Sequence, residues 1–206
     1  MSANSLREVN EWSRHVPFEV PNAPYGTLLV DPPWEVAGTW GFSPAVGYRT
    51  PYRVMPDAEV MGMRVYSISA PNSLLLLWAI NSRVPLALAV ADCWGFTYKT
   101  VLTWDKVRSG IGVWLKGQTE HLIVAVRGRV PPPTMTKRGT RWTTLLREVR
   151  REHSRKPDVI YDLAEDLGPP PRVELFARHQ REGWDAWGDE APSETQPLPA
   201  IEEALT

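Results

Sequence analysis

The chain has 206 residues, of which 43% are hydrophobic and 23% charged, a composition typical of a folded globular protein. Its one cysteine excludes an intramolecular disulfide and a cysteine-based zinc cluster. The longest apolar run covers only residues 74–80, whereas a membrane span needs about 20 residues, and the amino terminus has no signal-peptide core. We therefore expect a soluble, cytoplasmic protein.

The net charge of −1 conceals two segments of opposite charge. Residues 127–156 contain ten lysines and arginines but two acids, and residues 182–206 contain seven acids and no base. The basic segment is a candidate for phosphate contacts with a nucleic acid, and its alternative reading is solvated surface. Some of the ten tryptophans could likewise stack on bases.

Predicted strands and helices alternate along the chain. Apolar and β-branched runs predict strands over 25–30, 74–78, 97–104, 121–126 and 172–176. Helical patterns and end signals predict helices over 57–63, 85–94, 142–151 and 158–167, with loops over 35–56, 106–119 and 129–141. This alternation predicts an α/β sandwich with a mostly parallel sheet over 25–190, an amino-terminal arm over 1–24 and a disordered acidic tail over 191–206.

The first predicted strand ends at Asp31-Pro32-Pro33-Trp34. Ligands of open α/β sheets bind at the carboxyl ends of strands. The prolines fix the backbone direction and leave carbonyls without competing neighbouring N–H donors, and an ionised aspartate offers only acceptors. Asp31 and the Pro32 carbonyl could therefore hold both N–H bonds of an aromatic amine while Trp34 stacks on its ring. The structural alternative is a strand-ending turn with Trp34 in the core.

Seven segments in order resemble one family, the N6-adenine methyltransferases that include the catalytic subunit of the mRNA adenosine methyltransferase and many bacterial and phage members. The segments are DPPW at 31–34, PYRVM at 51–55, LLLLWAIN at 74–81, WGFTYKTVLTWDK at 94–106, GIGVWLKGQTEHLIVAVRG at 110–128, HSRKPDVIYDLAE at 153–165 and RVELFARHQREGWDAWG at 172–188.

The resemblance implies a Rossmann-like, S-adenosylmethionine-dependent fold in permuted order, with the catalytic segment ahead of the cofactor segment. It implies methyl transfer to N6 of adenine, and the compact chain favours DNA as the substrate. The same reaction on RNA remains open, as does a catalytically silent nucleic-acid-binding subunit of a heteromeric methyltransferase. A homodimer or heterodimer is also open. No metal is expected, because methyl transfer from a sulfonium needs none.

The resemblance also assigns roles to individual residues. The catalytic residues would be Asp31, Pro32, Pro33 and Trp34. The residues that bind the cofactor would be Asp31, Lys156, Glu174, Arg178, His179 and Gln180, with Lys156 at its methionine portion and residues 178–180 at its ribose. The residues that bind the substrate would be Trp34, Tyr52, Arg141, His153 and Ser154.

Overall fold

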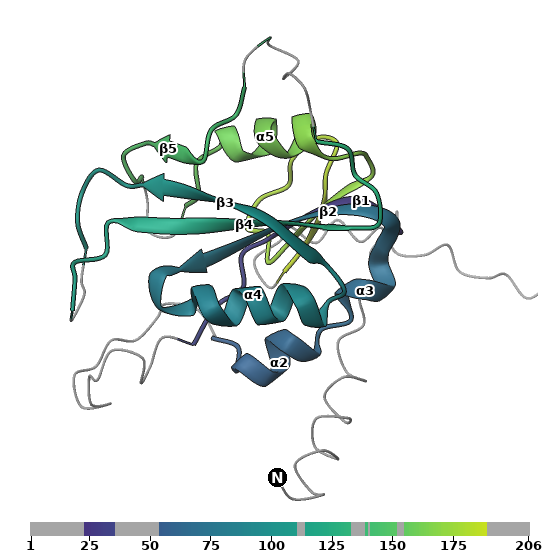
Figure 1. The fold of residues 1–206 in the computed structure, drawn as a ribbon, viewed down its shortest axis with the longest axis horizontal. Helices are drawn as coiled ribbons and strands as arrows, with labels where there is room; N and C mark the ends of the chain where they lie inside the picture. The colour runs from purple at the N-terminus through teal and green to yellow at the C-terminus, as the bar shows by residue number, and fades with distance from the viewer. Residues whose placement is uncertain are drawn as a thin grey trace, which may run out of the picture.

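The computed structural model describes residues 23–35, 54–110, 114–132, 139, 141–151 and 155–188, which form a seven-stranded sheet with helices on both faces (Figure 1). In chain order its elements are β1 (Tyr25–Val30), α2 (Asp57–Gly62), α3 (Val65–Ile68), β2 (Ser69–Ile80), η2 (Asn81–Arg83), α4 (Val84–Cys93), β3 (Thr97–Asp105), β4 (Thr119–Arg127), β5 (Leu145–Arg147), α5 (Val159–Leu167), β6 (Arg172–Leu175) and β7 (Asp185–Trp187).

The strands are arranged in the order β5-β3-β4-β2-β1-β6-β7. Strand β4 is antiparallel to both of its neighbours, β2 and β3, and every other neighbouring pair in the sheet is parallel. The predicted α/β sandwich with a mostly parallel sheet is therefore confirmed. The arrangement is that of a Rossmann-like methyltransferase fold.

Two apolar layers cover the sheet, which explains the uninterrupted run of leucines in β2. Leu75 and Leu77 face α2, α3 and α4, whereas Leu74 and Leu76 face α5. Figure 1 shows α5 on one side of the sheet and α4 on the other. A strand buried on both faces has no polar face, and so its sequence does not alternate.

The structure corrects the predicted basic helix over 142–151. Its centre forms β5, which pairs with the edge of β3. The indole N–H of Trp104 also donates to the Glu148 carbonyl at 2.8 Å. Thr143, Thr144 and Val149 are β-branched and favour an extended backbone, and the open edge of β3 supplies the hydrogen-bond partners that an extended segment needs.

Short elements were missed by the sequence patterns, and other boundaries shifted slightly. Strand β7 and helix α3 are three and four residues long, too short for a periodicity to appear. Strand β2 begins earlier than predicted, at Ser69. The arm over 1–24 and the tail over 191–206 lie almost entirely outside the described residues. No helix in the described part of the chain is long and apolar enough to cross a membrane.

Candidate active site

Charged and polar side chains from separate segments gather at one edge of the sheet. Asp31 follows β1, Asn81 follows β2, and Asp105 ends β3. Because β4 runs in the opposite direction, its second residue, Glu120, lies at this same edge, paired with the end of β2. This carboxyl edge is where open α/β sheets bind ligands.

The turn after β1 folds back on itself. The backbone N–H of Trp34 donates to the Pro32 carbonyl at 2.8 Å, and the N–H of Met55 donates to the Pro33 carbonyl at 2.9 Å. The expectation that these carbonyls lack competing donors is therefore wrong, since the turn and the segment beside it supply them. A carbonyl oxygen has two lone pairs, so Pro32 retains one for a second donor.

Trp34 lies in the core, where its side chain is 4% exposed. Its indole N–H donates to the Trp78 carbonyl at 3.0 Å, and its ring packs in the apolar layer that faces α4. Trp34 therefore occupies the core position that the structural alternative predicts. A contact between its ring and a target base stays a prediction.

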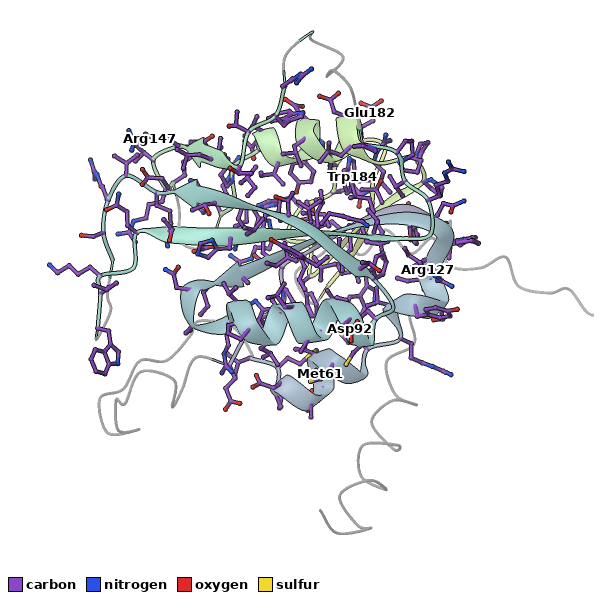
Figure 2. The ribbon with its side chains drawn as sticks, in the orientation of Figure 1. Met61, Asp92, Arg127, Arg147, Glu182 and Trp184 are labelled. Atoms are coloured by element: carbon purple, nitrogen blue, oxygen red, sulfur yellow. The ribbon has the colours of Figure 1, made fainter. Side chains whose placement is uncertain are left out.

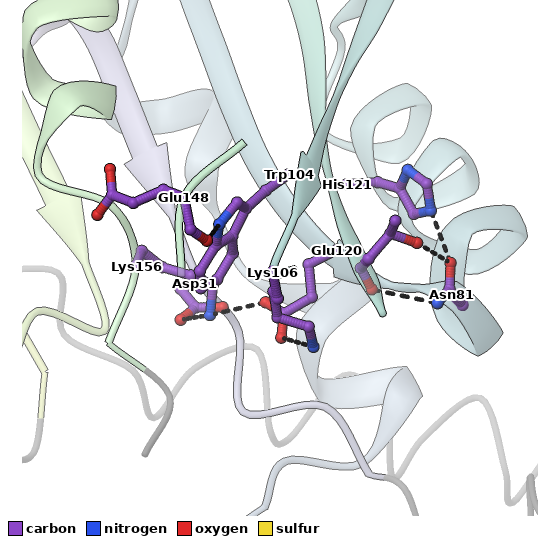
Figure 3. A network of polar contacts seen from close by, with 9 residues as sticks. Asp31, Asn81, Trp104, Lys106, Glu120, His121, Glu148 and Lys156 are labelled. Atoms are coloured by element: carbon purple, nitrogen blue, oxygen red, sulfur yellow. Dashed lines mark hydrogen bonds and ion pairs between the residues drawn. The ribbon is translucent and has the colours of Figure 1, made fainter. Parts of the chain in front are cut away.

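Lys156 reaches Asp31 from the segment that precedes α5. Its Nζ lies 2.5 Å from Oδ2 of Asp31, 3.4 Å from Oε2 of Glu120 and 5.4 Å from the centre of the Trp78 ring. The side chains of Lys156 and Asp31 are 19% and 30% exposed. The structure therefore brings together two residues that are 125 positions apart and that the resemblance assigns to the cofactor and the target amine (Figure 3).

Glu120 and Lys106 complete this charged cluster, and sequence reasoning missed both. The Nζ of Lys106 lies 3.1 Å from Oε1 of Glu120, so cations and carboxylates alternate from Lys106 through Glu120 and Lys156 to Asp31. The predicted strand began one residue after Glu120, and Lys106 lay in a predicted loop. An acidic residue directly before a buried run, Leu122–Val126, was the available signal.

Burial and neighbouring charges shift the pKa values of the residues in this cluster. Burial raises the pKa of Asp31, and the Lys156 ammonium offsets only part of this effect. Burial lowers the pKa of Lys156, but the carboxylates of Asp31 and Glu120 outweigh burial and raise it overall. Burial also acts to raise the pKa of Glu120, but Lys156 and Lys106 lower it overall. The pKa values of the two carboxylates are thus shifted in opposite directions, that of Asp31 upward and that of Glu120 downward.

A neutral network fixes the end of β2 to the start of β4. The Oδ1 of Asn81 lies 2.7 Å from Nε2 of His121, and the Asn81 amide donates to the Thr119 carbonyl at 3.1 Å. The Nδ1 of His121 lies 3.1 Å from the Thr103 hydroxyl. Burial lowers the pKa of His121, which favours the neutral imidazole. This network holds Glu120 in place from the neighbouring residues (Figure 3).

Glu174 lies on the face of the sheet covered by α5. The Tyr161 hydroxyl donates to its Oε2 at 2.6 Å, and burial raises the pKa of Glu174. The rings of Trp184 and Tyr161 meet nearly at a right angle with a centroid distance of 5.4 Å, and the Arg181 guanidinium lies 4.5 Å from the centre of the Tyr161 ring. Glu174 thus joins β6 to α5, and its contact with a cofactor stays a prediction.

The three residues predicted at the cofactor ribose follow β6. Arg178 is half-buried, and its charge acts to lower the pKa of Asp31, so its electrostatic effect reaches the cluster. His179 and Gln180 are exposed, and the Gln180 amide donates to the Trp184 carbonyl at 2.8 Å. The ribose contacts of all three stay predictions.

Most of the residues predicted to bind the substrate lie outside the described part of the chain. Tyr52, His153 and Ser154 lie outside the described residues. Arg141 is described and lies exposed ahead of β5. Their contacts with a substrate stay predictions.

The basic segment is neutralised in part by internal contacts. Arg127 donates to the carbonyls of Tyr66 and Ser69, and Figure 2 shows it at the far end of the sheet from Arg147. Arg151 lies 2.7 Å from Oδ2 of Asp158. The ten lysines and arginines of residues 127–156 therefore do not all face solvent on one surface, because some of them make contacts within the protein.

The donors at this edge fit the cofactor implied by the resemblance. An ammonium has three N–H donors, and Asp31 and Glu120 accept two from Lys156, which leaves one for the carboxylate of a methionine group. The charge of Arg178 acts to lower the pKa of Asp31, and the charge of Asp31 acts to raise the pKa of Glu174. Both residues therefore lie within electrostatic range of the cluster. Among the described residues, no group of three or more His, Cys, Asp or Glu could hold a metal ion.

The curated relatives fall into two groups. Type II methyltransferase M.MunI of Mycoplasma sp is 29% identical over an alignment that covers 88% of this chain and 84% of that protein. The N(6)-adenosine-methyltransferase MT-A70-like protein of Drosophila melanogaster is 30% identical over 75% of this chain, and the catalytic subunit METTL3 of Homo sapiens is 28% identical over 75%. The chain spans about a quarter of the length of these two relatives, 24% and 26%.

The family model MT-A70 matches residues 25–190, the same span as the predicted methyltransferase domain. The match includes Asp31, Glu120 and Lys156, which the fold brings into one cluster. The chain therefore belongs to the MT-A70 family of S-adenosylmethionine-dependent methyltransferases.

Proposed function

We propose that this chain transfers a methyl group from S-adenosylmethionine to the exocyclic N6 of adenine in DNA. The observation that carries the proposal is the pair of Asp31 and Lys156, an acceptor and a cation 2.5 Å apart at the carboxyl edge of the sheet. One member suits an amine and the other suits a carboxylate, which are the two groups that this reaction must hold.

Asp31 and Pro32 bind the target amine. Lys156 contacts Oδ2 of Asp31, so Oδ1 accepts one N–H of the amine, and the remaining lone pair of the Pro32 carbonyl accepts the other. The nitrogen lone pair of adenine is delocalised into the ring. Two acceptors on its hydrogens favour a tetrahedral nitrogen whose lone pair points at the methyl donor. The proton that is lost leaves through Asp31 or water, after the N–C bond has formed.

Lys156 binds the carboxylate of the cofactor's methionine portion, with Arg178, His179 and Gln180 at the ribose and Glu174 as a further acceptor. S-adenosylmethionine would supply, when bound, a methyl group on a sulfonium sulfur, and the neutral thioether that remains when the S–C bond breaks is a good leaving group. The protein therefore contributes chiefly by positioning the amine, which can account for a large share of the rate.

One comparison supports DNA as the substrate over RNA. The relative that the chain matches over 84% of its length is named a Type II methyltransferase, whereas the N(6)-adenosine methyltransferases are matched over about a quarter of their length. In duplex DNA the adenine must leave the stack, at a cost of a few kcal/mol.

Labelled methyl transfer tests the substrate. Purified protein is incubated with tritiated S-adenosylmethionine and, in parallel, unmethylated duplex DNA, single-stranded DNA or RNA, and the products are digested to nucleosides. Label in N6-methyldeoxyadenosine supports the proposal, whereas label only in N6-methyladenosine from RNA moves the substrate to RNA. An absence of label in all three polymers, despite cofactor binding, contradicts the proposal.

A catalytically silent subunit is the alternative from another class. Asp31 and Lys156 are both present and paired, which supports an enzyme. An Asp31→Ala variant separates the two, because an enzyme loses turnover and a scaffold retains its binding function.

A further inference from the structure

The loop between β3 and β4 presents two large apolar side chains to solvent. Trp114 is 96% exposed and Leu115 is 84% exposed. Figure 1 shows the described parts of this loop, residues 106–110 and 114–118, extending beyond the ends of β3 and β4. An exposed pair of this size at a loop tip, where burial would have stabilised the fold, indicates a surface for binding.

The base of the loop is held firmly while its tip stays exposed. Oδ1 of Asp105 accepts the backbone N–H of Val107 at 2.8 Å and the amide N–H of Gln118 at 2.9 Å. Farther out, the N–H of Gly110 donates to the Gly117 carbonyl at 2.7 Å. Val107 has φ 67°, which β-branched residues rarely adopt, and the bond to Asp105 holds it there. The two arms of the loop are thus joined at two levels between the sheet and Trp114, by Asp105 with Gln118 and by Gly110 with Gly117.

The charges around the tip identify the kind of partner. The segment 106–119 contains three cations and no acid, and two of them, Arg108 and Lys116, are exposed. Arg147 adds a further cation at the base of the loop, where its Nε lies 2.9 Å from Oδ2 of Asp105 and its side chain is 71% exposed. Exposed cations around an aromatic ring, in a segment without an acid, suit a polyanion with stacked rings.

The same loop is connected to the candidate catalytic cluster. Lys106, its first residue, lies 3.1 Å from Glu120, which lies 3.4 Å from Lys156, the partner of Asp31. A nucleic acid that presents an adenine to Asp31 would therefore pass this loop.

We propose that Trp114 stacks on an unpaired base of the bound polynucleotide, beside the target adenine. This inference rests on the proposed function and adds a residue that grips the strand. The occupant is a single-stranded or locally opened segment, because only an unpaired base exposes a free ring face to an indole.

Anisotropy of a fluorescein-labelled single-stranded DNA of about 20 nucleotides, longer than one binding site, tests the inference. We expect Trp114→Ala to weaken binding about tenfold, as for the loss of one base–aromatic stack. Trp114→Phe should bind within about threefold of the wild type because it keeps a ring, and Trp114→Leu should resemble the alanine variant. Tyr98→Ala is the matched control, since Tyr98 is a 48% exposed aromatic residue at the opposite end of β3.

Cofactor affinity, measured by calorimetry, should stay the same in every variant if each is folded. Wild-type binding by Trp114→Ala, or full binding by Trp114→Leu, overturns the stacking proposal alone. Sedimentation that shows a wild-type dimer and a Trp114→Ala monomer overturns it in favour of a protein interface. If the wild type binds neither DNA nor RNA, this inference and the proposed function both fail.

Discussion

Asp31 has two requirements that pull in opposite directions. It must be ionised to accept an amine N–H, yet burial raises its pKa above the ordinary value of 3.8. Lys156, at 2.5 Å, opposes that effect and keeps the carboxylate ionised to lower pH. In the proposed mechanism the lysine would therefore serve the target amine as well as the cofactor.

The fall of kcat at low pH should report this coupling between Lys156 and Asp31. Protonation removes the acceptor, so kcat should fall as the pH decreases through the pKa of Asp31. In Lys156→Gln the cation that lowers this pKa is gone, and the acid limb of the residual rate should move to higher pH. Rates at saturating cofactor over about pH 4–8 give the comparison. A limb that stays in place or moves to lower pH would contradict the coupling.

The stability of the same variant should also change. Without Lys156, the carboxylates of Asp31 and Glu120 lose a shared partner. Breaking a fully buried pair costs about 3–5 kcal/mol, and the partial exposure of this site should reduce the loss to about 2 kcal/mol. Urea denaturation measures it. The double variant Lys156→Gln/Glu120→Gln is the control and should recover part of the loss, whereas equal stability of the single variant and the wild type would refute the expectation.

At the scale of elements, the turn between β2 and α4 supports the Asp31-Pro32-Pro33-Trp34 segment from behind. Arg83 is buried, and its Nη1 lies 2.8 Å from Oδ2 of Asp57 in α2. Its Nη2 donates to the carbonyl of Glu35, the residue directly after Trp34. One guanidinium thus ties the motif to α2 and to the end of β2, which makes Arg83 a positioning residue.

Arg83→Lys should therefore lower kcat more than it affects cofactor binding. A lysine keeps the charge but cannot reach both partners with a planar fork. We expect about a tenfold loss in kcat, with the dissociation constant of S-adenosylmethionine within about twofold of the wild type. Lys99→Arg, on β3 away from the motif, controls for exchange between these residue types. A parallel loss of cofactor binding would mean that Arg83 supports the fold generally.

The junction of α5 with the sheet leaves no space for a side chain at Gly168. A Cβ on Gly168 would lie 2.1 Å from Oγ1 of Thr27 and 2.9 Å from Cδ2 of Leu74, both buried in the sheet. Gly168→Ala should therefore reduce the free energy of unfolding by about 2 kcal/mol. Gly62→Ala is the control, because nothing lies within 4 Å of its added Cβ. Urea denaturation compares them, and equal stability of both variants would show that the junction is looser than described.

Much of this fold could be predicted because its main elements carry strong local signals. The run Leu74–Ile80 and the amphipathic helix α5 depend on residues close together in sequence. The error at 142–151 has the opposite origin, since β5 exists because β3 offers an edge. The resemblance predicts separate roles for Asp31 and Lys156 but not their contact, which the fold makes. The bridge through Glu120 depends on the antiparallel direction of β4, which no local pattern reveals.

At the scale of the molecule, the candidate catalytic residues lie at the carboxyl edge of the sheet. The contacts made by Arg127 at the opposite end are structural. The carboxyl edge holds the charged cluster and the β3–β4 loop. At the other end, Arg127 lies 3.5 Å from the centre of the Tyr66 ring and binds nearby carbonyls. A nucleic acid is therefore expected along the carboxyl edge, and the basic segment contributes there through Arg147 more than through Arg127.

The most direct test of the central claim compares the wild type with Asp31→Asn. Both proteins are incubated with S-adenosylmethionine and adenine-containing DNA, N6-methyldeoxyadenosine is quantified by mass spectrometry, and cofactor binding is measured by calorimetry. We predict product from the wild type and at least about a 100-fold slower reaction from Asp31→Asn when both proteins are saturated with the cofactor. Product formation at the wild-type rate by Asp31→Asn, or methylation at another atom of the base, would contradict the assignment of this edge as the methyl-transfer site.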